Sequence, residues 1–564
     1  MSFKEDMMKT IADPLKIEIF KANKEYIQQN KIEPFVLKEF MEFFETGKRL
    51  SYESSYFARR RQLVVAALAY FYEKNSENKE WLEQLIWEVC NEWTWALPAH
   101  LSEQVLFNDQ ARIYIDLFSA ETGQALAEIY EQVGEELSPI VANRIRKEVE
   151  ERLILPFEKQ SWEWEQKKNN WSAVIGGCVG MACLSLLPKK SNRLERLLTK
   201  VDISLKNYLH SFGEDGICTE GVGYWGYGFG YYIYYAEKLA ESTGNHYYLE
   251  INKVKKIAEF PGKVRINNTY LPFSDFSQPN LPSGLLSFCV SRFGADIPIE
   301  TVSSLDFDKC YRFAHLYHNL RWTKKKESSV SNRQCDYFPD AQWFILNSVK
   351  QDLFFAAKGG DNRESHNHLD VGHFVFGNHE VLFLTDLGAG EYTKEYFHES
   401  KRYQYFVTSA KSHHLPILNG CSQVVNDGKA EVVRTDCANG EITYSLAETY
   451  STESYIEKFT RHFSVHEQKK ILVLHDRFCF SKAKNEIIEN FVSPIEPVIE
   501  EKKVILRTSN EVVEIKFDTR FLISLNVIKK QYHRHDGGLC EAHQIQAMYQ
   551  VAKETEIITS FVLM

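Results

Sequence analysis

Apolar residues recur at helical spacing through the first 320 residues of the chain. One run places its apolar side chains three and four residues apart on one helix face: Leu82, Leu85, Ile86, Val89 and Trp93. Another follows Ser138 and Pro139, a suitable N-cap and first-turn pair. Residues 174–187 are the longest strongly apolar stretch, about 14 residues against the ~20 that span a bilayer, and predict a buried helix. Several such helices indicate stacked helical hairpins.

The hydrophobic pattern changes near residue 330. Residues 323–334 (TKKKESSVSNRQ) are polar and charged without apolar periodicity, which is typical of an interdomain linker. Beyond them the spacing becomes two, as in the alternating residues Phe459, Arg461, Phe463 and Val465. The following HEQKK predicts a turn into the next strand, ILVLHD. We therefore predict a multidomain α+β protein, with a helical domain over residues 1–330 and an antiparallel β-sandwich over residues 331–564.

Length and charge narrow the functional classes. At 564 residues the chain is too long for one hydrophobic core, which favours two large domains. Its formal net charge of −10 argues against nucleic-acid binding, so an anionic ligand would need a local basic pocket. Arg59, Arg60 and Arg61 form one basic cluster, for which surface solubility is the alternative interpretation.

Targeting signals and cysteine usage point to a reducing compartment. The first 16 residues lack the apolar run of a secretory signal, and no stretch is long enough to span a membrane, so we expect a cytoplasmic protein. The 11 cysteines include no CxxC pair and predict reduced thiols rather than disulfides. The pattern carries no signal for an oligomeric state.

Seven of the 18 histidines fall between residues 361 and 414. In a strand, a period of two would place His366, His368 and Asp370 on one face. Zinc prefers histidine nitrogen and carboxylate oxygen in a tetrahedral shell, and His368, Asp386 and His413 are the trio that we select as ligands. The alternative is that these are ordinary residues at strand ends.

Three motifs in this segment resemble the signature of the heparinase II/III family of polysaccharide lyases. They are HNHLDVGHFVF, FLTDLGAGEY and SHHLPILNG, and YFPDAQWFIL (337–346) is similar to the entry strand of that family's sandwich. The resemblance implies an N-terminal (α/α) toroid followed by a β-sandwich, with His366 in catalysis and His368, Asp386 and His413 on one zinc ion. The family usually has His-Asn where this chain has His413-His414, so His414 stays an alternative ligand.

The helical half carries partner motifs of the same family. DGICTEGVGYWGYGFGYY (215–232) resembles an element whose first tyrosine is catalytic, which implies Tyr224, with Trp225 and Tyr227 as pocket neighbours. KKNNWSAVIGGCVGMACL (167–184) resembles the segment that supplies an asparagine to the substrate carboxylate, which implies Asn170.

Two further features of the helical half concern the sugar-binding cleft. WALPAH resembles a third family element and implies His100 near that cleft. Some relatives have a histidine directly after the asparagine, where this chain has Trp171, so a substrate preference borrowed from those relatives is in doubt.

The implied reaction is β-elimination on a uronic acid, with an acidic oligosaccharide or polysaccharide as substrate. An amide such as Asn170 would offset the carboxylate charge, His366 or Tyr224 would take the C5 proton, and Tyr224 or Tyr392 would protonate the leaving oxygen. Arg363 and Arg402 would contact substrate carboxylates or sulfates, with surface solubility again as the alternative. Because elimination consumes no water, we expect the zinc to be structural.

Three other functions remain open at this stage. An alginate-type oligouronide lyase would use the same chemistry on a different uronate. A metal-dependent glycan hydrolase would use the histidine and aspartate cluster to activate water. A non-catalytic glycan-binding protein would keep the fold alone.

Overall fold

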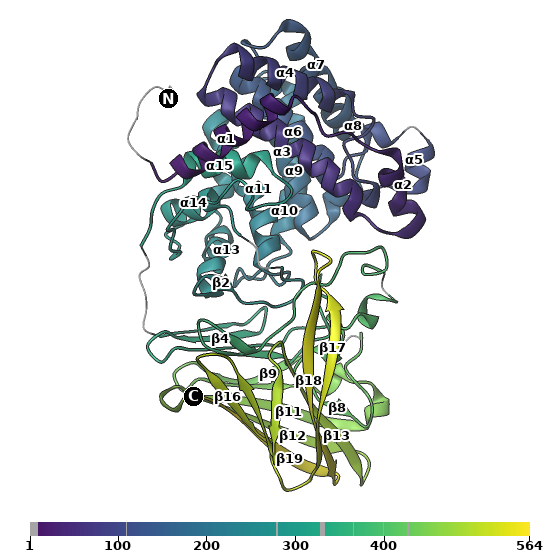
Figure 1. Cartoon of the computed structure of the whole chain (residues 1–564), viewed down its shortest axis with the longest axis vertical. Helices are drawn as coiled ribbons and strands as arrows, with labels where there is room; N and C mark the ends of the chain where they lie inside the picture. Colours follow the sequence, from purple (N-terminus) through teal and green to yellow (C-terminus); the bar gives the residue numbers. More distant parts are fainter. Residues whose placement is uncertain are drawn as a thin grey trace. The chain divides into compact units, whose positions relative to one another are not determined.

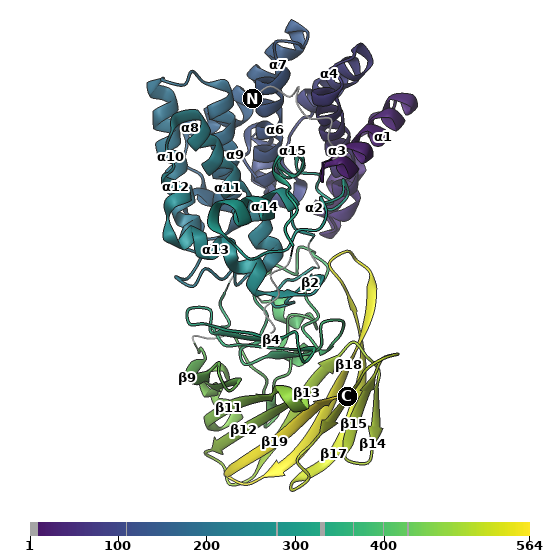
Figure 2. The same ribbon diagram turned by 90° about the vertical axis from the view of Figure 1, so that its left-hand side faces the viewer.

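The computed structural model describes residues 10–564 except 109, 278–279, 328–332, 365, 399 and 426–427. The chain divides into two compact units. The helical unit comprises Met1–Phe212, Tyr224–Glu259 and Asn280–Ser328, and the β unit comprises Gly213–Gly223, Phe260–Pro279 and Ser329–Met564. The boundary predicted near residue 330 lies outside the described residues. The predicted fold class, a helical toroid followed by antiparallel sheets, is confirmed (Figures 1 and 2).

The helical unit is built from pairs of one deeply buried and one amphipathic helix. The buried members are α3 (Leu50–Tyr72), α6 (Leu117–Val133) and α9 (Asn170–Leu186). They pack respectively against α4 (Ser76–Asn91), α7 (Pro139–Val149) and α10 (Asn192–Leu209), each of which buries a single stripe. A helix that is apolar all round must be enclosed by others, so this alternation gives the inner and outer helices of a toroid.

The buried helix α9 confirms the prediction made for residues 174–187. It packs closely against α11 (Val222–Thr243), and a Cβ at Gly177 would lie 2.8 Å from the Tyr231 carbonyl oxygen. Glycine at this position therefore sets the approach of the two helices that carry Asn170 and Tyr224. The remaining helices are α1 (Asp13–Gln29), α2 (Leu37–Thr46), α5 (Glu103–Phe107), α8 (Leu155–Lys159), α12 (Tyr247–Glu250), α13 (Asn252–Lys263), α14 (Ser283–Phe293) and α15 (Phe313–Trp322).

The basic cluster at residues 59–61 is not a solubility patch. Arg59 and Arg60 are buried in α3 and bind the carboxylate of Glu92, with Arg60 at 2.7 Å. Arg61 pairs with Asp306 at 3.0 Å. Both sequence-based interpretations of this run were wrong for Arg59 and Arg60, because their charges are neutralised inside the unit.

Among its described residues, the β unit contains three antiparallel sheets and a short hairpin (Figure 2). The hairpin is β1 (Arg265–Ile266) with β2 (Thr269–Tyr270). One sheet has the order β3 (Gln334–Phe338), β4 (Trp343–Ser348), β5 (Leu353–Lys358), β6 (Phe374–Gly377) and β7 (Leu382–Leu384). A second has the order β17 (Leu522–His533), β18 (Leu539–Val551), β13 (Asn485–Ser493) and β8 (Ile417–Leu418). The third has the order β14 (Pro497–Glu500), β15 (Lys503–Arg507), β16 (Val512–Lys516), β19 (Glu554–Leu563), β12 (Ile471–Phe480), β11 (Ile456–His466), β10 (Glu441–Ser445) and β9 (Glu431–Asp436).

One aromatic core joins these three sheets. Phe374 of β6 lies 5.2 Å from Phe463, 5.5 Å from Phe561 and 6.3 Å from Phe491, measured between ring centroids. The alternation predicted for β11 is confirmed, since Phe459, Phe463 and Val465 all point into this core. Burial of such rings is the largest stabilising contribution that a sandwich of this kind offers.

Two further expectations can be compared with the structure. All 11 cysteines are free thiols, as the unpatterned spacing predicted. Among the described residues, no helix has both the length and the apolar character that a bilayer crossing requires.

Candidate active site and metal centre

Five segments of the β unit bring the histidine-rich motif together with its partners. His366 and His368 lie between β5 and β6 in a loop, not in the strand that the sequence predicted. Asp386 follows β7, and His413 follows a turn of 3₁₀ helix at Ala410–Ser412. Arg402 opens another such turn at Arg402–Gln404, and Asp275 follows β2.

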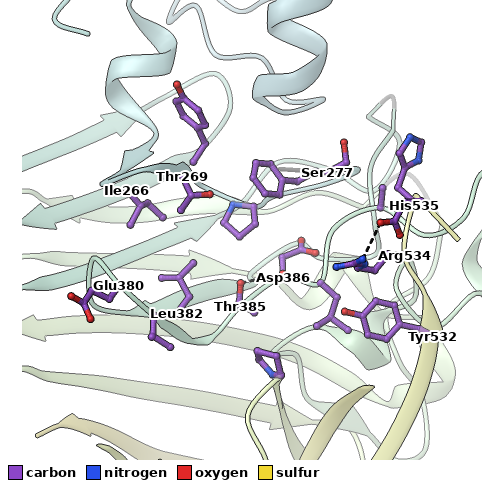
Figure 3. A pocket seen from close by; sticks show the side chains of 18 of the residues that line it. Ile266, Thr269, Ser277, Glu380, Leu382, Thr385, Asp386, Tyr532, Arg534 and His535 are labelled. Carbon is purple, nitrogen blue, oxygen red and sulfur yellow. Dashed lines mark hydrogen bonds and ion pairs between the residues drawn. The ribbon is translucent and has the colours of Figure 1, made fainter. Parts of the chain in front are cut away.

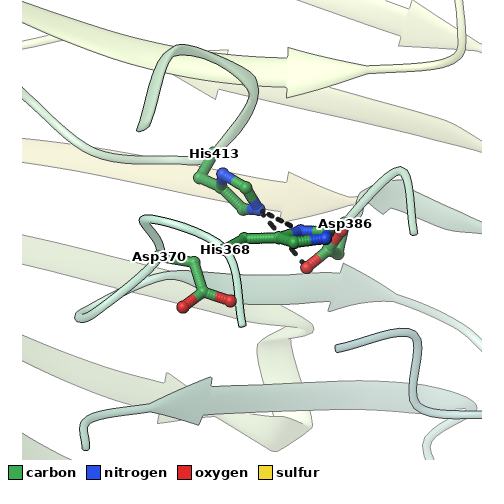
Figure 4. Close-up of side chains that lie close together, drawn as sticks. All are labelled: His368, Asp370, Asp386 and His413. Atoms are coloured by element: carbon green, nitrogen blue, oxygen red, sulfur yellow. Dashed lines mark hydrogen bonds and ion pairs between the residues drawn. The ribbon is translucent and has the colours of Figure 1, made fainter. Parts of the chain in front are cut away.

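The three predicted ligands face one another in the interior (Figure 4). His368 Nδ1 lies 3.3 Å from His413 Nε2 and 3.6 Å from an Asp386 oxygen, and His413 Nε2 lies 3.4 Å from the other. Atoms bound at 2.0–2.2 Å to one tetrahedral ion would be separated by about 3.3–3.6 Å. The spacing of the trio therefore fits a single metal ion.

Hydrogen bonds to the outer nitrogens support this interpretation. His368 Nε2 donates to Asp275 Oδ1 at 3.1 Å, and His413 Nδ1 donates to the Ser409 carbonyl oxygen at 2.9 Å. Since both partners can only accept, the two nitrogens that face each other carry lone pairs when the rings are neutral. Two lone pairs at 3.3 Å repel, and either a proton on one ring or a metal ion between the two nitrogens removes that repulsion.

The charges around His368, Asp386 and His413 also favour a bound cation between these three side chains. Burial opposes the charged form of Asp386, but His413 and His368 hold the pKa of its carboxyl well below the usual range. Burial likewise lowers the pKa of His368, but Asp386 and Asp275 outweigh it and raise that pKa to about 9. Among the described residues, Asp386 Oδ2 has no hydrogen-bond donor. The cluster can therefore hold a metal ion.

Two neighbours complete the description of the cluster. Asp370 lies beside the trio in Figure 4, and its Oδ2 pairs with Lys358 Nζ at 2.8 Å. His414, the alternative ligand, instead accepts a hydrogen bond at Nδ1 from the Val492 backbone N–H at 3.0 Å. Of the histidine pair, His413 is the one whose ring nitrogen lies within the cluster.

His366 is held by a residue that the sequence interpretation missed. Its Nδ1 donates to Asp275 Oδ2 at 2.9 Å, and its backbone has a φ of +55°. A left-handed conformation costs a non-glycine residue about 1–3 kcal/mol and occurs disproportionately at functional sites. Asp275 lies 91 positions earlier in the chain, in PFSDFSQPN, where no motif or periodicity marks it.

Arg402 bonds to the same aspartate, whereas Arg363 and Tyr392 are not among the residues bonded to Asp275 in the described part of the chain. Arg402 is buried and donates to Asp275 Oδ2 and to the Asn367 carbonyl oxygen, both at 2.9 Å, so the solubility interpretation was wrong for it. Arg363 is exposed. Tyr392 is half-buried, and its ring centroid lies 4.2 Å from that of His535.

In the helical unit, two of the family-like motifs meet. His100 Nδ1 donates to Asp116 Oδ2 at 2.7 Å, which fixes the ring orientation. The His100 ring then lies 4.9 Å from that of Trp171, the residue after Asn170. Asn170 itself is buried in the first turn of α9, where the side chain of Asn169 provides the N-cap. WALPAH and NNW therefore form one local site.

The tyrosine motif begins helix α11. Tyr224 is half-buried in its first turn, and Tyr227 donates to the buried Glu121. Trp225, expected to contact substrate, is fully buried and donates its indole N–H to the Ile257 carbonyl oxygen at 2.7 Å. Its side chain therefore packs the interior of the helical unit and offers no surface to a sugar.

A cavity of about 450 Å³ lies on another side of Asp386 (Figure 3). Aromatic rings of Phe276 and Tyr532 and hydroxyls of Thr269 and Thr385 line it. The cluster residues themselves are at most 3% exposed, and Asp386 is the one of them that forms part of the wall of this cavity.

The architecture defines a class of protein. The fold is that of the polysaccharide lyases that combine a helical toroid with a β-sandwich. Heparinase III aligns over 91% of this chain and 77% of its own, with a TM-score of 0.67 and 13% identity. Heparan sulfate lyase HepC from Pedobacter heparinus aligns over 99% and 85%, with a TM-score of 0.62 and 11% identity.

A third solved structure also has a similar fold. Chondroitin AC lyase from Streptomyces coelicolor A3 aligns over 100% of this chain and 80% of its own, with a TM-score of 0.55 and 8% identity. No protein-family model and no curated protein sequence matches the chain. The chain therefore has a heparinase-like polysaccharide lyase fold, as the motif resemblance implied.

Proposed function

We propose that the protein is a lyase that cleaves uronic-acid-containing glycans, of glycosaminoglycan type, by β-elimination. The hydrogen bond from His366 to Asp275 is the observation that carries the proposal. A carboxylate accepts only, so the proton of the neutral ring belongs on Nδ1 and Nε2 is the basic nitrogen. The fold supports the same function, because the similar solved structures are named as heparinase, heparan sulfate and chondroitin lyases.

The chemistry assigns a part to each predicted residue. Asn170 would donate to the uronate carboxylate and stabilise the charge that develops when the C5 proton leaves. His366 or Tyr224 would take that proton, the C4–O4 bond would break, and Tyr224 or Tyr392 would protonate the departing oxygen. The product is a 4,5-unsaturated uronate. His100 and Arg363 are the proposed substrate-binding residues. Arg402, first predicted to bind substrate, is buried and donates instead to Asp275 and to the Asn367 carbonyl oxygen.

We propose zinc as the ion of the buried cluster, one per chain. Two histidine nitrogens and one carboxylate oxygen are ligands that zinc prefers. A bound zinc ion would supply a fixed positive charge that links the loops of His368, Asp386 and His413. Because elimination needs no activated water, its role is structural.

The test is a screen for unsaturated products. Heparin, heparan sulfate, chondroitin, hyaluronan and alginate oligosaccharides are incubated with the protein, and the ultraviolet absorbance of the new C4–C5 double bond is followed. We expect absorbance with a glycosaminoglycan and at least about a 100-fold loss of turnover in His366→Ala. His379→Ala is the matched control, since His379 also bonds an aspartate, Asp352, at 2.7 Å and lies outside the cluster.

The same screen separates the alternatives. Absorbance with alginate only would identify an oligouronide lyase of another substrate class. New reducing ends without absorbance would identify a hydrolase and contradict the proposal. Binding without any product would identify a non-catalytic glycan-binding protein.

A further inference from the structure

Asp275 places one carboxylate between the proposed base and the proposed metal centre. Its side chain is fully buried. Oδ2 accepts hydrogen bonds from His366 Nδ1 and Arg402 Nη2, both at 2.9 Å. Oδ1 accepts from His368 Nε2 at 3.1 Å and from the Tyr396 hydroxyl at 2.6 Å. Each oxygen thus serves one histidine of the HNH motif.

These bonds determine which nitrogen of each histidine carries a proton. A carboxylate offers lone pairs only, so His366 must donate from Nδ1 and His368 from Nε2. The opposite nitrogens, His366 Nε2 and His368 Nδ1, are then the basic ones. One group therefore selects the nitrogen that would take a substrate proton and the nitrogen that would bind the metal.

The backbone holds this carboxylate in place from both sides. The Ser274 hydroxyl donates to the Thr219 carbonyl oxygen at 3.0 Å, and the Ala389 N–H donates to the Phe276 carbonyl oxygen at 2.9 Å. A buried carboxylate that accepts four hydrogen bonds from fixed partners can orient its donors without rearrangement.

We infer that Asp275 is a positioning residue that ties the orientation of His366 to that of the metal ligand His368. Its loss would weaken metal binding and slow turnover together. The turnover half of this inference rests on the proposed lyase function, whereas the metal half does not. The competing explanation is that Asp275 only neutralises the buried charge of Arg402.

The experiment compares Asp275→Asn with the double variant Asp275→Asn/Arg402→Met in the full chain. The double variant removes the uncompensated arginine charge, so it restores folding stability if the single variant is destabilised. Zinc affinity is measured by competition with a chromophoric chelator, and kcat and KM with the substrate found in the screen. Asp352→Asn is the matched control, because Asp352 bonds a histidine of the same unit, His379, at 2.7 Å and is not a member of the cluster.

We expect both Asp275 variants to bind zinc about 10- to 100-fold more weakly than the wild type. We also expect kcat to fall at least about 100-fold while KM changes by less than about threefold. Asp352→Asn should match the wild type in all three quantities. Recovery of zinc affinity and kcat in the double variant would show that charge balance is the whole role and would overturn the inference.

Failure of the proposed function gives a different result. If the wild type forms no unsaturated product, the zinc measurements still decide the metal half. Folded Asp275→Asn that binds zinc as tightly as the wild type would overturn that half. A wild type that binds no zinc would also overturn it, whatever its activity.

Discussion

Arg461 is a buried cation of the β unit that contacts the loops next to the candidate metal cluster. It is 0% exposed, binds Asp476 at 2.6 Å and donates to the carbonyl oxygens of Gly372 and His414. We predict that Arg461→Met lowers the free energy of unfolding by about 3–5 kcal/mol, because it leaves Asp476 and Glu489 as uncompensated buried acids. Denaturant titration measures this value.

The neighbouring strand supplies the control for this prediction. Arg477→Met removes an arginine of β12 that is 66% exposed and pairs loosely with Glu556 at 3.7 Å. Such a surface change should stay within about 0.5 kcal/mol of the wild type. Equal effects of the two substitutions would mean that burial does not determine the contribution of Arg461.

Site residues could be predicted from the sequence only where they lie in a recognisable motif. His368, Asp386 and His413 stand in recognisable segments, and the structure brings them together. Asp275 was missed because its four donors come from residues 91 to 127 positions later, and no local pattern records such long-range bonds. Trp225 was misjudged because composition does not distinguish a stacking ring from a packed one.

At the scale of single elements, helix α15 makes the helical unit sensitive to acid. His315 is 3% exposed and its Nδ1 lies 2.9 Å from the Tyr234 hydroxyl oxygen. Burial lowers its pKa to about 3, against 6.5 for an ordinary imidazole. The unfolded chain therefore takes up the proton first, so this stability contribution is complete above pH 6.5 and is lost as pH falls towards 3.

The free energy of unfolding should therefore depend measurably on pH. Below pH 6.5 His315 should reduce the free energy of unfolding by up to about 1.4 kcal/mol per pH unit. His315→Gln should flatten this slope, followed as the pH dependence of denaturant unfolding by far-ultraviolet circular dichroism. His210→Gln, at the exposed end of α10, should leave the slope unchanged, and an equally steep curve for both variants would contradict the assignment.

The cavity beside β7 leads to a prediction about the rate of metal loss. Ser277 lies on its rim, and Asp386 forms part of its wall. If metal leaves through this opening, Ser277→Trp should slow chelator-driven zinc release several-fold without changing equilibrium affinity. Stopped-flow release measures the rate, and Ser509→Trp, in an exposed turn, is the control. An unchanged rate in Ser277→Trp would exclude this route.

Elements were predicted well where a period persisted and poorly where it did not. The apolar runs of α4 and α9 and the alternation of β11 needed only local spacing. Residues 366–370 alternate like a strand but form a loop, because their backbone groups bond outside a sheet: the Leu369 N–H donates to the Thr408 carbonyl oxygen and the Asn367 carbonyl oxygen accepts from Arg402. Trp93 matched the helical spacing of α4 yet lies beyond its end and is 50% exposed.

At the scale of the whole molecule, the two units interleave along the chain. The change of period near residue 330 separates most helices from most strands, but Gly213–Gly223 and Phe260–Pro279 belong to the β unit. Among their described residues, these segments hold the start of α11, the end of α13 and the short hairpin of β1 and β2, so no strand periodicity marks them as part of the β unit. The second of these segments carries Asp275. The site residue that the sequence did not predict therefore lies in a segment that the sequence did not assign to the β unit.

This division predicts where metal removal acts. The trio and Asp275 all belong to the β unit, so zinc binding should stabilise that unit and leave the helical unit unaffected. At free zinc 100 times above Kd, linkage gives about 2.7 kcal/mol. Hydrogen exchange should therefore show lost protection around residues 366–373, 386–390 and 409–415 after verified zinc removal, with α3, α6 and α9 unchanged. Equal loss in those helices, or no loss in the loops, would contradict a structural metal confined to the β unit.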